Sequence, residues 1–173
     1  MNLPNKLTCI RILLVPVCLV LISCRLYMVG ALVFAAACLT DLFDGMIARK
    51  HGLVTNFGKF ADPIADKVLT VTMMICMASQ GLLPVWLPLI VVIRELMVDG
   101  LRLIAMEKGR VVAAGWSGKV KTVLQMVTIL LTLLGLGYDF VVALSVVVCV
   151  LTVYSGVVYF YGLRDLFKKD FGA

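Results

Sequence analysis

The chain has 173 residues, of which 62% are apolar and 15% are charged, and its mean hydropathy is +1.09. A soluble domain of this length would be nearer half apolar and a quarter charged, so the composition argues against a soluble globular protein, a disordered chain or a fibrous repeat. The net charge of +6 comes from basic residues between apolar runs, which favours cytoplasmic loops and contact with anionic lipid over binding to nucleic acid.

Six helices of bilayer-spanning length are predicted. A span needs about 20 mainly apolar residues, so a chain of this length has room for roughly six spans and no separate soluble domain. Two turn signals, Gly81-Leu82-Leu83-Pro84 and Gly135-Leu136-Gly137, divide the longest apolar runs. The helices are expected at residues 7–27, 29–50, 58–79, 84–107, 118–136 and 139–162. The sequence therefore predicts an all-α integral membrane protein, with one transmembrane domain over residues 1–173.

The basic residues predict the orientation of these spans. They cluster at both ends of the chain, between the second and third helices, and between the fourth and fifth, whereas the other turns hold only Arg25. Because cytoplasmic loops carry an excess of Lys and Arg, both termini are expected in the cytoplasm of a multi-pass protein, in a bacterial inner membrane. An alternative is a lipoprotein signal peptide ending at Leu21-Ile22-Ser23-Cys24. The pattern described below at the start of the chain argues against it.

The six cysteines all lie in apolar stretches, and no two of them form a CxxC pair. We expect them to be small buried apolar side chains, not disulfides or zinc ligands. The only histidine is His51, and a single histidine without clustered cysteines makes a zinc site improbable.

Four carboxylates are predicted to converge near the cytoplasmic ends of the second and third helices. Asp41 and Asp44 are spaced i, i+3 and share one helix face. Asp62 and Asp66 are spaced i, i+4 and share a face of the next helix. A short connection joins the two helices, so we expect antiparallel neighbours that bring all four side chains to one membrane depth.

Four clustered carboxylates need cations to stay ionised together. One interpretation is neutralisation by the nearby Arg49, Lys59 and Lys67. The stronger interpretation is divalent metal, because oxygen-only ligands favour Mg²⁺, Mn²⁺ or Ca²⁺. Two such ions sharing carboxylates suit phosphoryl chemistry, and Arg49 could bind a phosphate through two hydrogen bonds.

Segment 41–66 reads D-x-x-D-G-x-x-A-R, eight further residues, then G-x-x-x-D-x-x-x-D. This pattern resembles the signature of the CDP-alcohol phosphotransferase family. Segments 2–11, 57–67, 93–102 and 118–126 are similar to the phosphatidylglycerophosphate synthase branch of that family, so the resemblance covers nearly the whole chain except the last helix. Asp99 departs from the branch pattern and is expected to pair with Arg102 across i, i+3.

The resemblance implies a function and a set of site residues. The reaction would transfer the phosphatidyl group of CDP-diacylglycerol to glycerol 3-phosphate, releasing CMP, in a membrane-embedded homodimer of six-span subunits. Two Mg²⁺ or Mn²⁺ ions would bind Asp41, Asp44, Asp62 and Asp66, and Asp66 would be the general base on the glycerol hydroxyl. The residues that would contact the CDP-lipid are Asn5, Thr8, Gly45, Arg49, Thr55 and Gly58.

Basic residues farther along the chain predict a pocket for the phosphate of the acceptor. Arg94 and Arg102 lie eight residues apart, on roughly one face of the fourth helix. Lys119 and Lys121 begin the fifth helix, which is expected to pack antiparallel to the fourth, and Lys121 should point partly away. Glycerol 3-phosphate has a phosphate for such a pocket, whereas free serine has none. Alternatively, the arginines pair with acids of their own helix and the lysines touch lipid headgroups.

Two other functions remain open from the residues alone. Another member of the same family would use a different acceptor, as a cardiolipin, phosphatidylserine or inositol-phosphate lipid synthase does. A cation channel or transporter with an acidic site belongs to a different class. The acids, however, lie at one membrane end instead of the midplane, and no inverted repeat is visible, which argues against transport.

Overall fold

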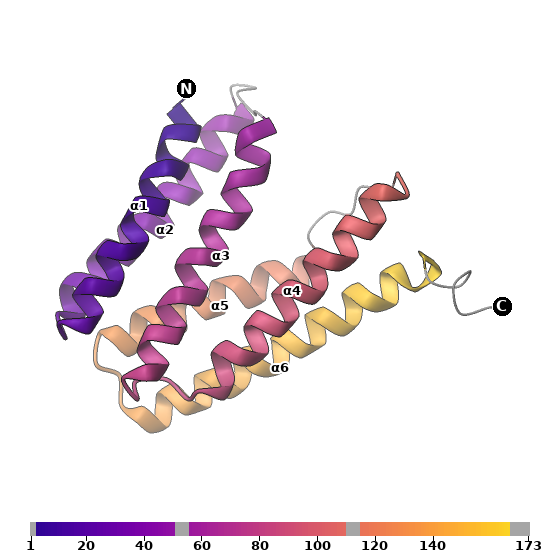
Figure 1. Cartoon of the computed structure of the whole chain (residues 1–173). Coiled ribbons are helices and arrows are strands. Elements are labelled where there is room, and N and C mark those ends of the chain that lie inside the picture. The colour runs from indigo at the N-terminus through magenta and orange to yellow at the C-terminus, as the bar shows by residue number, and fades with distance from the viewer. Residues whose placement is uncertain (1–2, 51–55, 110–114, 167–173) are drawn as a thin grey trace.

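The computed structural model describes residues 3–50, 56–109 and 115–166; within these ranges the side chains of residues 3–5, 42–50, 56, 57, 59, 60 and 166 lie outside the description. The described chain is entirely helical (Figure 1). Its elements are α1 (Leu3–Ser23), α2 (Tyr27–Lys50), α3 (Asn56–Ser79), α4 (Trp86–Glu107), α5 (Trp116–Leu133), α6 (Tyr138–Leu163) and the short 3₁₀ helix η1 (Arg164–Leu166).

The six predicted helices are confirmed, with ends that shift by a few residues. The largest shift is in α1, which ends at Ser23 because Arg25 adopts a left-handed conformation with φ of 59°. The two predicted turn signals also end helices, since Gly81 has φ of 72° and Gly135 has φ of 86°. Glycine adopts these positive φ values without the steric cost that a Cβ would impose.

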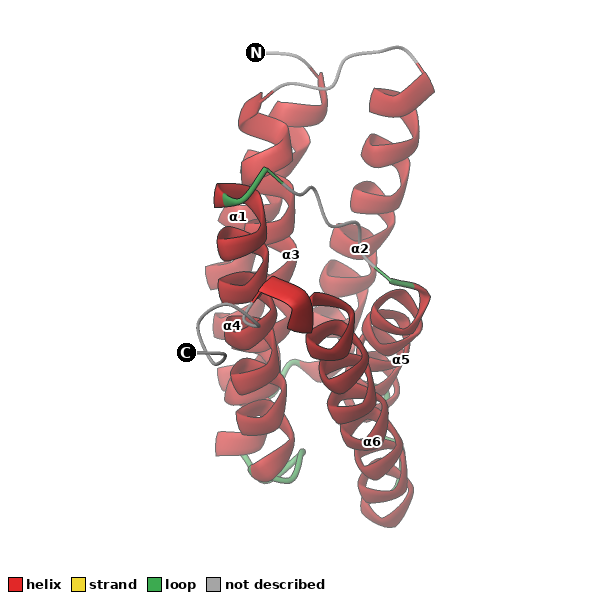
Figure 2. Ribbon diagram, turned by 90° about the vertical axis from the view of Figure 1, so that its right-hand side faces the viewer, coloured by secondary structure: helices red, strands yellow, loops and turns green. Residues whose placement is uncertain are grey.

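The helices form two groups of three. In one group α1 packs against both α2 and α3, and in the other α6 packs against both α4 and α5. Figures 1 and 2 show the two groups lying side by side. Among the described residues, α2 and α3 are not closely packed neighbours, and neither are α4 and α5. The prediction that α2 packs beside α3, and α4 beside α5, is therefore wrong, because α1 lies against both members of the first pair and α6 against both members of the second.

Apolar side chains fill the interior and also cover the outside. Phe34, Met73 and Met77 are buried at the centre of α1, α2 and α3, whereas Leu96 and Phe140 are 67% and 69% exposed. By length and composition, two described segments could cross a bilayer, Lys6–Ser23 and Tyr138–Leu163. An apolar exterior of this kind suits contact with lipid chains, so the chain has the character of a helical membrane protein.

All six cysteines are free thiols. The prediction that they are buried holds for Cys18 only, since Cys24 is exposed and the other four are half-buried. A thiol that faces an apolar environment such as lipid chains needs no polar partner.

Candidate active site

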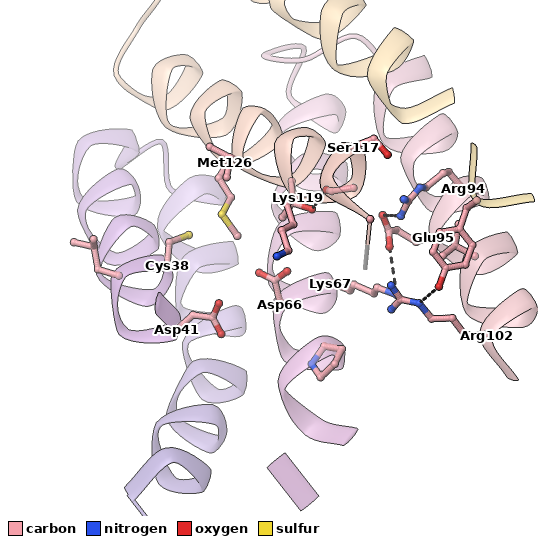
Figure 3. Close-up of a pocket in the computed structure, with 18 residues that line it drawn as sticks. Cys38, Asp41, Asp66, Lys67, Arg94, Glu95, Arg102, Ser117, Lys119 and Met126 are labelled. Carbon is pink, nitrogen blue, oxygen red and sulfur yellow. Dashed lines mark hydrogen bonds and ion pairs between the residues drawn. The ribbon is translucent and has the colours of Figure 1, made fainter. Parts of the chain in front are cut away.

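A cavity of about 600 Å³ lies between the two three-helix groups. Residues of α2 and α3 form one wall, residues of α4 and α5 form the other, and α6 contributes Tyr159. Figure 3 shows acidic side chains on the first wall and most of the basic ones on the second. The cavity therefore brings together residues as far apart in the sequence as Cys38 and Tyr159.

The first wall carries two of the predicted carboxylates, Asp41 and Asp66. Their side chains turn toward one another across the cavity (Figure 3) and lie close enough to repel. Asp62 also lies near Asp41, and its Oδ1 accepts a hydrogen bond of 2.5 Å from the Thr8 hydroxyl. Asp41 therefore lies near both Asp62 and Asp66, with α1 packed between α2 and α3, while the convergence of all four aspartates stays a prediction.

Arg11 of α1 pairs with the acidic wall, a contact that sequence reasoning missed. Its NH1 lies 2.5 Å from Asp41 Oδ1, and its side chain is 1% exposed. In the sequence, Arg11 belongs to the basic residues at the start of the chain and to segment 2–11 of the family resemblance. A stronger signal was available, because a charged side chain inside an apolar span is usually functional and needs a partner. Arg11 supplies positive charge to the acidic wall.

The donor set of the acidic wall fits a hard divalent ion. The aspartates offer oxygen only, which Mg²⁺ and Mn²⁺ prefer over the ligands of zinc or copper. Within residues 3–50, 56–109 and 115–166, no three His, Cys, Asp or Glu side chains are close enough to hold an ion together. The side chain of Asp44 lies outside the description, so the four-aspartate ligand set stays a prediction.

Glu95 pairs with several basic side chains beside the cavity. Its Oε1 accepts a hydrogen bond of 3.0 Å from Arg94 NH1 and pairs with Lys121, and its Oε2 lies 3.3 Å from Lys67 Nζ. These contacts join α3, α4 and α5 at one depth. In the sequence, Glu95 belongs to segment 93–102 and is one of the acids with which an arginine of its own helix could pair. Its half-buried, multiply paired carboxylate shows why the basic residues can gather there without strong mutual repulsion.

Arg102 has a different environment from Arg94. The prediction that Asp99 pairs with Arg102 is wrong, because Asp99 bonds to Lys67. Arg102 donates instead from Nε to the Tyr159 hydroxyl at 2.8 Å. Among the described residues no carboxylate pairs with Arg102 or with Lys119, and both line the cavity. These two cations are therefore available to an anionic ligand.

Lys121 lies away from the large cavity. Its side chain is 3% exposed and pairs with Glu95. It lines a separate space of about 50 Å³ together with Asp66 and Gln125. This position agrees with the expectation that Lys121 points partly away from Lys119, although its role in binding phosphate is still a prediction.

The predicted CDP-lipid contacts are described only in part. Thr8 is buried beside Asp62, and Gly58 is buried in α3. The remaining ones lie outside the described residues or side chains: Asn5, Gly45, Arg49 and Thr55. The CDP-lipid subsite therefore stays a prediction.

Comparison with known proteins agrees with the geometry of the cavity. The family model described as CDP-alcohol phosphatidyltransferase matches residues 1–158. The chain is 42% identical, over 95% of its length and 83% of the relative, to "Probable phosphatidylglycerophosphate synthase" of Mycobacterium tuberculosis (strain ATCC 25618 / H37Rv).

Two further relatives are named "CDP-diacylglycerol--glycerol-3-phosphate 3-phosphatidyltransferase". The Bacillus subtilis (strain 168) protein is 41% identical over 74% of each chain. The Rickettsia typhi (strain ATCC VR-144 / Wilmington) protein is 37% identical over 96% of this chain and 99% of the relative. The resemblance first read from segment 41–66 is thereby confirmed, and the chain belongs to the CDP-alcohol phosphatidyltransferase family.

Proposed function

We propose that the chain transfers the phosphatidyl group of CDP-diacylglycerol to glycerol 3-phosphate, giving phosphatidylglycerophosphate and CMP. One observation carries the proposal. A single cavity has two facing carboxylates on one wall, and on the other Arg102 and Lys119, two cations without a carboxylate partner among the described residues. The names of the relatives support the same pair of substrates.

In the proposed reaction, Arg102 and Lys119 hold the phosphate of glycerol 3-phosphate through charge-assisted hydrogen bonds. The acceptor is thereby oriented with its hydroxyl toward the acidic wall. The hydroxyl oxygen forms a bond to the β-phosphorus, and the bond between that phosphorus and the oxygen of CMP breaks. Asp66 accepts the hydroxyl proton and so acts as the general base. It lies on the wall opposite the phosphate-binding residues.

The reaction also needs positive charge near the diphosphate. We propose that Asp41, Asp44, Asp62 and Asp66 hold two Mg²⁺ or Mn²⁺ ions for this purpose. Bound divalent ions would neutralise the diphosphate and stabilise negative charge on the departing CMP. Arg11 balances part of the charge on Asp41 and keeps its carboxylate turned into the cavity.

The proposed membrane placement has all six helices crossing a bacterial inner membrane, with both termini in the cytoplasm. The basic segments after α2 and α4 support this orientation. The cavity would then open toward the cytoplasm, where a soluble acceptor meets a lipid substrate. The family resemblance also supports a homodimer.

The substrate assignment predicts a clear preference among acceptors. The purified protein with CDP-diacylglycerol and Mg²⁺ or Mn²⁺ is expected to release CMP with glycerol 3-phosphate. It should release little CMP with serine, which lacks a phosphate. Chromatography of CMP and lipid products over a panel of acceptor alcohols is the measurement. Faster release with serine, inositol phosphate or phosphatidylglycerol would assign another family reaction, and no metal-dependent CMP release would favour a cation transporter.

Replacing Arg102 or Lys119 by alanine is expected to raise KM for glycerol 3-phosphate. The loss of one charge-assisted hydrogen bond costs about 1.5–3 kcal/mol, or roughly ten- to a hundredfold in KM. The KM for CDP-diacylglycerol should change much less, since these side chains lie on the wall opposite the aspartates. Steady-state kinetics with each substrate varied in turn measures both constants.

Arg164→Ala is the matched control for these two variants. Arg164 is exposed, stacks on the Tyr161 ring at 5.4 Å and does not line the cavity. The Arg164→Ala substitution removes one positive charge, as Arg102→Ala and Lys119→Ala do, and leaves the proposed acceptor subsite unchanged. Equal weakening of both substrates in Arg102→Ala, or the same effect in Arg164→Ala, would contradict the acceptor pocket and favour a general role in lipid attraction.

A further inference from the structure

Both arginines of the cavity are held by hydroxyl groups of α6. Arg102 donates from Nε to Tyr159 at 2.8 Å, and Arg94 donates from Nε to the Ser155 hydroxyl at 3.2 Å. Ser155 and Tyr159 are four residues apart, so they lie on one face of α6. Gly156 makes room for this contact, because a Cβ there would lie 3.4 Å from Arg94 Cγ. The face of α6 that packs on α4 is therefore built to receive two arginine side chains.

The contact with Tyr159 constrains Arg102 in two ways. The hydroxyl accepts a hydrogen bond from Nε, and the guanidinium carbon lies 5.4 Å from the centre of the tyrosine ring. A guanidinium has five N–H groups, so use of the single one at Nε leaves the four on the two terminal nitrogens for another ligand. These four N–H groups match two oxygens of a phosphate.

We propose that Tyr159 is a positioning residue of the acceptor site, which holds Arg102 so that its terminal N–H groups face the phosphate of the acceptor. This inference rests on the proposed function. Holding a long side chain in its binding orientation before the ligand arrives lowers the entropy lost on binding. It also keeps Arg102 from pairing with Asp99, which lies one turn earlier on α4 and bonds to Lys67.

Tyr159 is not part of the signature that identified the family. The family model matches residues 1–158, and the resemblance read from the sequence did not reach the last helix. Tyr159 nevertheless lines the cavity beside Arg102. The last helix therefore contributes to acceptor selection as well as to packing.

Tyr159→Phe tests this role, because it removes the hydroxyl and keeps the ring. The KM for glycerol 3-phosphate is expected to rise roughly three- to tenfold, less than for loss of Arg102 itself, because Tyr159 acts only through Arg102. The kcat and the KM for CDP-diacylglycerol should stay near their wild-type values. Tyr161→Phe is the control, since Tyr161 is 64% exposed on the same helix. A fall in kcat with unchanged KM, or no change, would overturn the proposal.

A double-mutant cycle distinguishes a role through Arg102 from a merely structural one. In an Arg102→Ala background, Tyr159→Phe should cause no further rise in KM for glycerol 3-phosphate. The same fold-change in both backgrounds would overturn the positioning role while leaving the proposed function intact. If Arg102→Ala itself leaves KM unchanged, the acceptor pocket fails instead. If the wild-type protein does not use glycerol 3-phosphate, the proposed function fails.

Thermal unfolding in detergent, measured for every variant, identifies loss of folding. If Tyr159→Phe unfolds, Tyr159→Trp replaces it, because tryptophan also lacks the hydroxyl.

Discussion

Asp66→Asn is expected to lower turnover by about 10²–10⁴-fold, the usual contribution of a general base. Asparagine has nearly the same shape as aspartate, but its amide does not accept the hydroxyl proton at neutral pH. Asp66 lines the same cavity as Arg102 and Lys119, which have no carboxylate partner in the described part of the chain, and this agrees with the proposed mechanism. If Asp66 also binds metal, the loss of turnover will be larger. Release of CMP at saturating concentrations of both substrates measures the effect.

Asp139→Asn is the control for this substitution. Asp139 is exposed in the first turn of α6 and does not line the cavity, so turnover should stay near the wild-type value. The Asp66→Asn protein should still insert into membranes and bind CDP-lipid. Near-normal turnover in Asp66→Asn would remove Asp66 from the mechanism and reduce it to a carboxylate that balances nearby basic residues.

Asp41→Ala is expected to abolish activity and to weaken the binding of Mn²⁺. Asp41 faces Asp66 across the cavity and also lies near Asp62, so it is suited to bridge two ions. Its loss would remove one shared oxygen ligand and leave the guanidinium of Arg11 facing the ion site. Calorimetric titration of Mn²⁺ into wild-type and variant protein measures the change in affinity, alongside CMP release.

The ion pair between Arg11 and Asp41 suggests an alternative role for Asp41, which is to neutralise the charge of Arg11. If Asp41 serves only to neutralise Arg11, Asp41→Ala will lower stability and leave the affinity for Mn²⁺ unchanged. Asp99→Ala is the matched control, since Asp99 is also paired with a basic residue, Lys67, but lies outside the cavity lining. It should retain wild-type binding of Mn²⁺. Equal loss of Mn²⁺ affinity in both variants would point to a general effect of negative charge.

Much of this protein follows from its sequence alone, because the relevant signals are local. The length of each apolar run and the Gly81 and Gly135 turns determined where the six helices begin and end, to within a few residues. The spacings of Asp41 and Asp44, and of Asp62 and Asp66, determined which carboxylates share a helix face. The order of these residues along segment 41–66 was also enough to identify the family.

Arg94 pairs with Glu95 of its own helix, as one alternative from the sequence had it, but the partners of other charged side chains were decided only by the tertiary structure. Sequence spacing paired Asp99 with Arg102, yet Asp99 bonds to Lys67 of α3, and Arg102 bonds to Tyr159 of α6. Arg11 likewise reaches Asp41 on another helix. Spacing within one helix cannot reveal such partners, because each charge pairs with whichever opposite group the packing brings nearest.

The arrangement of the helices was also outside the reach of the sequence. From the sequence we expected α2 to pack on α3 and α4 to pack on α5. In the structure α1 packs on both α2 and α3, and α6 packs on both α4 and α5. A loop limits only the distance between two helix ends, whereas the contacts along the helices depend on the fit of all their apolar faces at once. The same packing leaves the cavity between the two groups, and so it decides which acids and which cations meet there.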